Sequence, residues 1–218
     1  MPTRPWPPTE PFDGRKRWHP VLPSAAAKGF PAAMGIGGLG QPDVMAAMWC
    51  RTTLDDAHAY YQSARHAAWA NWAIERMEDW SPTEDDFQRA VQAMWIAGCQ
   101  LLISAHLAQQ WVRRADPAVD EVAGLRRARN SVEHLVEADF DNTHIIASTA
   151  VDENGKEKAW DIKKLPEGHL IMGLGRRPLT SVFDAVSLDD IVAFASQHAH
   201  RDADVDLADS TYMLRPAD

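Results

Sequence analysis

Two long stretches with helical spacing occupy the centre of the chain and limit the folds it can adopt. Between residues 43 and 80, apolar side chains recur three and four positions apart, which predicts one long helix or two joined helices. A second stretch runs from Ser81-Pro82-Thr83-Glu84 to about Arg114. Its opening is typical of a helix start, with Ser81 as the cap and Pro82 in the first turn. These stretches favour a mainly α fold.

The sequence after Arg114 predicts a shorter helix, a small β region and a last helix. Asp116-Pro117 ends the second helix and is expected to start a third, which runs to about Ala138. Asn154-Gly155 lies between residues 145–149 and 159–162, a pattern that predicts a hairpin with a two-residue turn. Residues 169–172 are expected to form another short strand, and Ser187 to cap a helix ending near His198. We therefore expect four or five helices with a β-hairpin or small sheet inserted at about 143–175.

The two ends of the chain differ in composition from the centre. Residues 1–41 hold more than half of the fourteen prolines and several glycines, which predicts an extended arm. The residues after His198 are rich in aspartate and are expected to form an acidic tail. We therefore expect one helical domain over residues 42–218, with the β insertion inside it.

Charge and cysteine content restrict partners and compartment. A net charge of −9 argues against a protein that simply coats nucleic acid. Five arginines (Arg113, Arg114, Arg126, Arg127 and Arg129) are nevertheless grouped within a nearly balanced central segment, which predicts a local phosphate site. Cys50 and Cys99 sit in apolar helical segments and are expected to be reduced core residues of a cytoplasmic protein. The most apolar run, 94–105, is too short to span a bilayer, so no membrane partner is expected.

The short motif Arg129-Asn130-x-x-x-His134 carries the strongest chemical signal. A histidine can move a proton near neutral pH. An arginine can hold a phosphate and stabilise charge that builds on its oxygens. In a regular helix Arg129 and His134 lie on different faces, whereas Arg127, Asn130 and His134 share one. These residue types suit phosphodiester chemistry without a metal or another cofactor.

The motif resembles that of the HEPN family, whose ribonuclease members carry an arginine, four to six further residues and a histidine. The resemblance covers about residues 43–140 and implies a metal-independent endoribonuclease. In it His134 would move the proton of the substrate 2′-hydroxyl, Arg129 would clamp the phosphate, and Asn130 would orient either group. Arg126 and Arg127 would add phosphate contacts. The resemblance also implies a homodimer, RNA as substrate, and a toxin or antiviral role with a possible antitoxin or regulatory protein as partner.

Several alternatives remain open from the sequence. Arg129 could instead pair with Glu133 one helical turn later, leaving His134 as a surface residue. The protein would then be a non-catalytic helical dimer that binds a nucleotide or a partner protein. Arg51 and His58 have a similar spacing to the motif and form a rival pair. A further hypothesis is a metal-dependent hydrolase that uses His198 and His200, because imidazoles near carboxylates suit zinc, iron or manganese.

Overall fold

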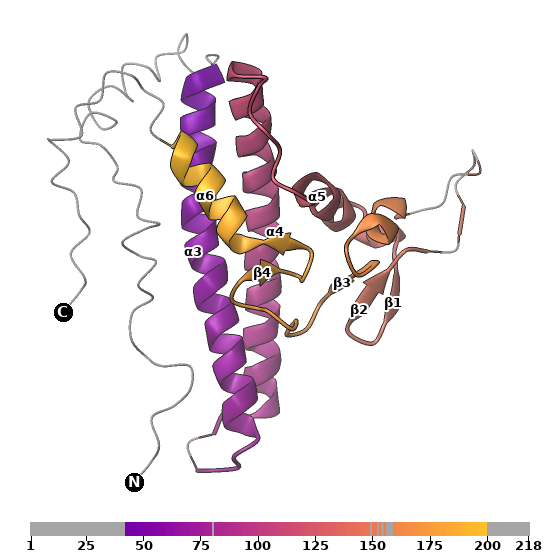
Figure 1. The fold of residues 1–218 in the computed structure, drawn as a ribbon. Coiled ribbons are helices and arrows are strands. Elements are labelled where there is room, and N and C mark those ends of the chain that lie inside the picture. Colours follow the sequence, from indigo (N-terminus) through magenta and orange to yellow (C-terminus); the bar gives the residue numbers. More distant parts are fainter. Residues whose placement is uncertain are drawn as a thin grey trace, which may run out of the picture.

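The computed structural model describes residues 42–199, except for residues 80, 149, 152, 154 and 156–158. The predicted arm at 1–41 and the tail after residue 199 lie outside the described residues. Within the described part the chain forms four α-helices and two small antiparallel sheets, which confirms the predicted mainly α fold with a small β region. Figure 1 shows two long helices side by side, with a shorter helix across them and the β-rich segment beside one of them.

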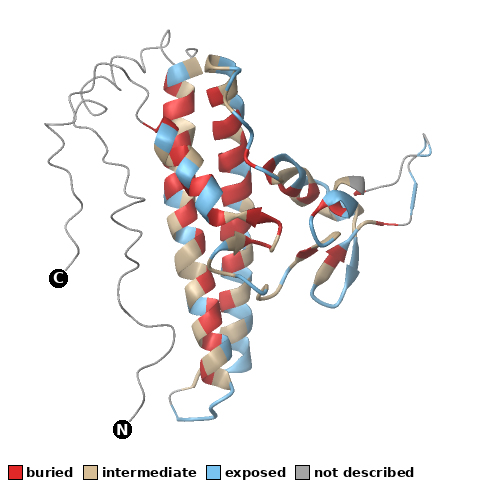
Figure 2. Ribbon diagram, viewed as in Figure 1, coloured by how far each residue is buried: buried red, intermediate tan, exposed pale blue. Residues whose placement is uncertain are grey.

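The two long helices form an antiparallel hairpin. Helix α3 spans Pro42–Ile74 and α4 spans Glu84–Ala115, so each is roughly 50 Å long at 1.5 Å per residue. Alanines occupy much of the contact and allow the two helices to approach closely; buried examples are Ala57, Ala64, Ala67, Ala97, Ala105 and Ala108. Figure 2 shows buried positions on the facing sides of the pair and exposed positions on the outside. The hairpin is therefore the scaffold to which the other elements attach.

The turn between the long helices is fixed by two capping residues. The Thr83 hydroxyl accepts a hydrogen bond from the Asp86 N–H (3.2 Å), and the Asp86 carboxylate accepts one from the Thr83 N–H (3.0 Å). The cap is therefore Thr83, and the prediction of Ser81 was wrong. Ser81 also has an acidic residue three positions later, Glu84, but the reciprocal hydrogen bonds of a capping box form between Thr83 and Asp86. Ser81 instead donates to the Ala73 carbonyl (2.8 Å) and accepts from the Glu78 N–H (3.0 Å), which holds the end of α3.

Helix α4 contains a long apolar stretch. It is the one helix within residues 42–199, as far as these are described, that is long and apolar enough to cross a bilayer, with a mean hydropathy of 1.3 over 18 residues. Of that window 50% is buried inside the molecule. Met94, Leu101 and Leu102 are among its buried side chains. In this structure α4 is therefore a core helix of the bundle.

Helix α5 is shorter than the sequence predicted. It spans Leu125–Glu133, so the expected start at Asp116-Pro117 was wrong. The residues between α4 and α5 form a loop that is held by a hydrogen bond from the Val122 N–H to the Gln109 side-chain oxygen (2.7 Å). Gly124 precedes the helix with φ +77°, a left-handed conformation that glycine adopts easily. A side chain there would also meet the Ala185 carbonyl oxygen at 3.1 Å.

A three-stranded antiparallel sheet follows α5 and the short 3₁₀ helix η1 (Leu135–Glu137). Its strands are β1 (Asp139–Asp141), β2 (His144–Ile146) and β3 (His169–Ile171), in the order β1-β2-β3. Strand β3 confirms the short strand expected at 169–172. The hairpin across Asn154-Gly155 was wrong, because β2 pairs with β1 on one side and β3 on the other. Residues Trp160–Lys164 form a second 3₁₀ helix, η2, in place of the expected strand.

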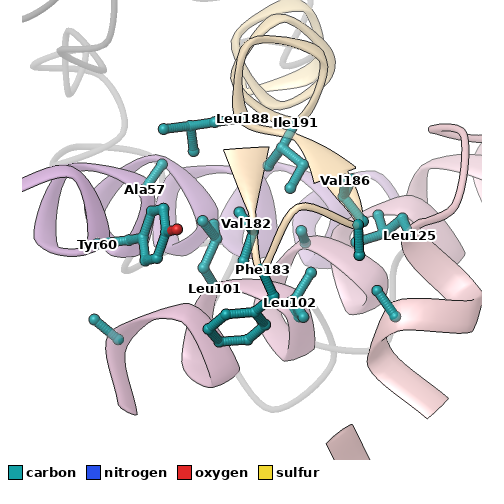
Figure 3. Packing of buried hydrophobic residues seen from close by; sticks show 14 of the residues in the cluster. Ala57, Tyr60, Leu101, Leu102, Leu125, Val182, Phe183, Val186, Leu188 and Ile191 are labelled. Atoms are coloured by element: carbon teal, nitrogen blue, oxygen red, sulfur yellow. The ribbon is translucent and has the colours of Figure 1, made fainter. Parts of the chain in front are cut away.

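A second, two-stranded hairpin leads into the last helix. It consists of β4 (Ser181–Val182) and β5 (Val186–Ser187), and two of the three turn residues between them, Phe183 and Asp184, have φ 55°. Helix α6 (Leu188–His198) begins at Ser187, whose hydroxyl accepts from the Asp190 N–H, so the predicted cap is confirmed. Figure 3 shows side chains from α3, α4, α5, α6 and this hairpin meeting in one core. The core thus fixes α5 against the long helices.

Candidate functional site

The residues of the predicted motif lie on α5 and at its C-terminal end. Arg126, Arg127, Arg129 and Asn130 are on the helix, and His134 is the residue that ends it, with φ −100° and ψ 21°. The helix therefore does not continue through the motif. Arg129 and His134 do not belong to one regular helical face, and each has its own set of partners.

Arg129 is held by its neighbours on α5. Its Nη1 lies 2.5 Å from Oε2 of Glu133 and donates to Oδ1 of Asn130 at 3.2 Å. The Arg129 side chain is 27% exposed, and its Nε is buried without a hydrogen-bond partner within the described residues. This is the i,i+4 pairing that the non-catalytic alternative predicts. The guanidinium is thus anchored through one terminal nitrogen.

Two hydrogen bonds attach η2 to α5. Nδ2 of Asn130 donates to Oδ2 of Asp161 at 3.2 Å, and Nη1 of Arg127 donates to the Lys164 carbonyl oxygen at 3.2 Å. Both acceptors belong to η2, which is distant from α5 in the sequence. Asn130 therefore connects Arg129 to η2, and Arg127 uses part of its guanidinium for a structural contact.

His134 is exposed and paired with a carboxylate. Its side chain is 54% exposed, and its Nδ1 lies 3.3 Å from Oε1 of Glu137, which is on η1. This contact forms because the chain turns into η1 directly after His134. The other ring nitrogen of His134, Nε2, takes no part in this contact. A histidine oriented by a carboxylate is suited to proton transfer.

Basic side chains from two elements lie together at this corner. Arg126 and Arg127 of α5 and Lys163 and Lys164 of η2 are all exposed. The bond between Arg127 and the Lys164 backbone keeps the two pairs adjacent. We call these four residues the basic α5–η2 surface. The sequence identified its two arginines, whereas nothing in the sequence pairs η2 with α5.

The sequence did not identify His106, which the fold places beside Arg129. His106 lies on α4, is 4% exposed, and its Nε2 is 3.0 Å from Nε2 of Gln110. Burial, followed by the nearby Arg129 cation, lowers the pKa of His106, and Glu133 acts in the opposite direction. Its helical position predicts only a core face, because its proximity to the Arg129 charge depends on how α5 crosses α4.

The rival sites receive little support from the geometry. Arg51 is buried on α3 and His58 is half-buried. His198 is 2% exposed and its ring packs on Phe194 with centroids 4.9 Å apart, whereas His200 lies outside the described residues. Among the described residues no group of three or more His, Cys, Asp or Glu side chains is placed to hold a metal ion.

A hollow of about 450 Å³ lies away from the motif, between the loop after η2 and the β4–β5 hairpin. Arg176, Arg177 and Asp184 line it together with small polar side chains. The Asp184 carboxylate is already engaged, since it accepts from the Arg176 N–H (2.8 Å), the Arg177 N–H (3.3 Å) and the Ser181 hydroxyl (2.9 Å). None of the residues predicted for the site lines this hollow.

No family model matches the chain, and neither a curated protein nor a solved structure matches it. The resemblance to the HEPN family therefore stays a prediction based on the short motif. The residues of α5, η1 and η2 described above are therefore the basis of the proposed function.

Proposed function

We propose that the protein is a metal-independent endoribonuclease of the HEPN type. The observation that carries this proposal is the exposed His134, whose Nδ1 faces Glu137. Glu137 would fix the ring so that Nε2 takes the proton of a substrate 2′-hydroxyl. The hydroxyl oxygen then attacks the adjacent phosphorus, the bond to the 5′ oxygen breaks, and that oxygen takes a proton from water. The products are a cyclic phosphate end and a 5′-hydroxyl end.

Arg129 would stabilise the charge on the phosphate, which requires it to leave Glu133. An i,i+4 ion pair with both partners partly exposed contributes only about 0.3–0.5 kcal/mol. Hydrogen bonds from an arginine to a charged phosphate contribute about 1.5–3 kcal/mol each. Giving up the Glu133 pair is therefore a small cost for Arg129 when it turns to a phosphate. Asn130, which touches Arg129, would orient the guanidinium or the substrate.

The basic α5–η2 surface supports RNA as the partner. Its four exposed cations concentrate positive charge on a chain with a net charge of −9. Phosphate contacts of this kind position a strand without reading its bases. By the family resemblance we further propose a cytoplasmic homodimer, with a toxin or antiviral role and an antitoxin or regulatory protein as partner.

The test is cleavage of total RNA in the presence of EDTA by the full-length chain. We expect the wild type to leave cyclic phosphate ends. His134→Ala should lose at least about 100-fold in rate, the usual contribution of a general base, and Arg129→Ala should lose a similar factor through the phosphate contact.

The matched controls are His66→Ala and Arg176→Ala, which remove an exposed histidine on α3 and an exposed arginine outside the site. Both should cleave like the wild type. Equal cleavage by the wild type and by both site variants would exclude this site, and absence of cleavage by the wild type would exclude the nuclease.

A second candidate function is non-catalytic binding of a nucleotide or a partner protein. The Arg129–Glu133 pair and the Asn130–Asp161 bond favour it, because both side chains have structural partners in this conformation. Binding of RNA that depends on Arg126 and Arg127, without any cleavage, would select this function over the nuclease.

A further inference from the structure

His106 is a buried residue of α4, the long helix against which α5 packs, and the charges of the Arg129–Glu133 pair of the proposed site act on it. Two hydrogen-bonded contacts join this part of α4 to the segment that follows it: Gln109 accepts from the Val122 N–H (2.7 Å), and Arg113 pairs with Glu121. His106 precedes Gln109 by one helical turn on the same side of α4. The charged groups that act on it are Arg126, Arg129 and Glu133 of α5 and Glu121 of the preceding loop.

The His106 ring has one satisfied nitrogen and one that lacks a partner. The Gln110 amide nitrogen can only donate, so the Nε2 of His106, 3.0 Å away, accepts. The ring proton then lies on Nδ1. That nitrogen is buried and has no hydrogen-bond partner within the described residues. A buried N–H without an acceptor is costly, so Nδ1–H is a donor that an added acceptor or charge would satisfy.

The ion pair next to it changes when the proposed site is used. As long as Glu133 holds Arg129 at 2.5 Å, the carboxylate is neutralised by the guanidinium. If Arg129 turns to a phosphate, Glu133 remains behind without its cation. Two histidines near Glu133 can gain a positive charge near neutral pH: His134 is exposed and belongs to the proposed site, and His106 is buried.

We propose that His106 is a positioning residue that takes up a proton and becomes the counter-charge of Glu133 when Arg129 binds a phosphate. This rests on the proposed function, in which Arg129 exchanges Glu133 for RNA. The proton comes from solvent and goes to Nε2, where the Gln110 side chain turns so that its carbonyl oxygen, in place of its nitrogen, faces the ring and accepts. His106 does not touch the substrate. The role of His106 is to stabilise the released state of Arg129 and so to favour phosphate binding.

The sign of the coupling follows from the neighbours of His106. In the free protein, burial and Arg129 lower the pKa of His106. Removing Arg129 while Glu133 stays takes away one lowering influence and keeps a raising one, so phosphate binding raises the pKa of His106. Binding is then accompanied by proton uptake. The affinity for phosphate should therefore increase as the pH falls through the His106 titration, by about tenfold if binding raises the His106 pKa by one.

The first experiment follows the His106 ring by NMR without any ligand. The signal is assigned by its loss in His106→Gln, and its titration is compared in the wild type, Arg129→Gln and Glu133→Gln. Arg129→Gln should titrate at higher pH than the wild type, and Glu133→Gln at lower pH. If Arg129→Gln does not move the titration upward, the proposed coupling is wrong whatever the protein does to RNA.

The second experiment adds an RNA oligonucleotide with 2′-O-methyl riboses, which cannot be cleaved. In the wild type the His106 titration should shift upward on binding, and affinity should rise toward acid pH. The affinity is compared in a His134→Gln background, so that the exposed histidine of the site adds no pH dependence of its own. There His106→Gln should leave binding at pH 8 unchanged but should abolish the rise, which a purely structural role would not produce. If RNA binds through Arg129 but the His106 titration does not move, the role of His106 is wrong and the proposed function stands. If RNA does not bind, the proposed function and the role of His106 are both wrong.

Discussion

Gly98 on α4 has no side chain, and this lets the β4–β5 turn pack closely against the helix. A Cβ at this position would lie 2.5 Å from Cζ of Phe183 and 3.1 Å from Cε2 of Tyr60. The Phe183 ring cannot easily move away, because it is 4% exposed and packs at a tilt on Trp95 with centroids 4.1 Å apart. The glycine is therefore required by packing and not by backbone conformation.

We predict that Gly98→Ala destabilises the protein by about 1–3 kcal/mol, the usual cost of overpacking a core. In an exposed helix the same change would stabilise the protein by about 0.5–1 kcal/mol. The sign of the change in stability therefore shows whether packing at Gly98 decides the outcome. Urea denaturation of the purified chain measures it. Adding Phe183→Leu should make Gly98→Ala less harmful than it is beside phenylalanine, and equal costs in both backgrounds would show that the ring is not the obstacle.

Among elements, the start of α4 gives a prediction with a pH dependence. Hydrogen bonds from the Thr83 hydroxyl and backbone N–H, together with Arg89, lower the pKa of Asp86 to about 2. A lowered pKa means that the ionised carboxylate stabilises the folded state above the unfolded value of about 4. This stabilisation is lost as the pH falls from about 4 to 2.

We predict that Thr83→Ala lowers stability by about 1 kcal/mol at pH 7, the typical loss of an N-cap hydroxyl. Thr83→Ser keeps the hydroxyl and should stay close to the wild type. As the pH falls from about 4 to 2, the difference between the wild type and Asp86→Asn should shrink, since the Asp86 carboxylate becomes protonated. Thermal unfolding between pH 2 and 7 tests this, and a constant difference over that range would refute the capping box.

The sequence could predict those elements in which the spacing of apolar residues repeats many times. Helices α3 and α4 each have about nine turns over which the apolar spacing can repeat, and the Ser187 cap marks α6 directly. Strands β1, β2 and β3 have three residues each, too few for alternation to be detected. The turn that joins β1 to β2 contains Asn142, with φ 53°. The sequence had instead predicted a hairpin turn at Asn154-Gly155.

The candidate site was predictable by residue type but not by partner. Arg129, Asn130 and His134 stand out in the sequence, and so does the possible pairing of Arg129 with Glu133. Their tertiary neighbours, Asp161 on η2 and His106 on α4, depend on how separate elements cross. Periodicity within one segment contains no information on such crossings.

For the whole molecule, the basic α5–η2 surface predicts how RNA binding depends on salt. Each phosphate neutralised on a single strand contributes about −0.7 to the slope of log affinity against log salt. Four cations therefore predict a slope of roughly −3. The double variant Lys163→Ala/Lys164→Ala should reduce its magnitude by about 1 to 1.5, as measured by fluorescence anisotropy with an uncleavable oligonucleotide.

The matched control is Arg176→Ala/Arg177→Ala, which removes the same charge from another exposed part of the chain. It should leave the slope unchanged. If both double variants change the slope equally, the effect reflects the overall charge of the protein, and the α5–η2 surface has no special role.

The position of α6 has a consequence for synthesis on the ribosome. Helices α3 and α4 can pair as soon as both have emerged, because their contacts are local in sequence. Helix α6 packs back onto α3, at the opposite end of the described chain. At about 5–20 residues per second, several seconds separate the completion of α4 from that of α6. During that interval the nascent pair of long helices exposes the apolar side that α6 later covers. We therefore expect this protein to depend on chaperones most strongly before α6 is made.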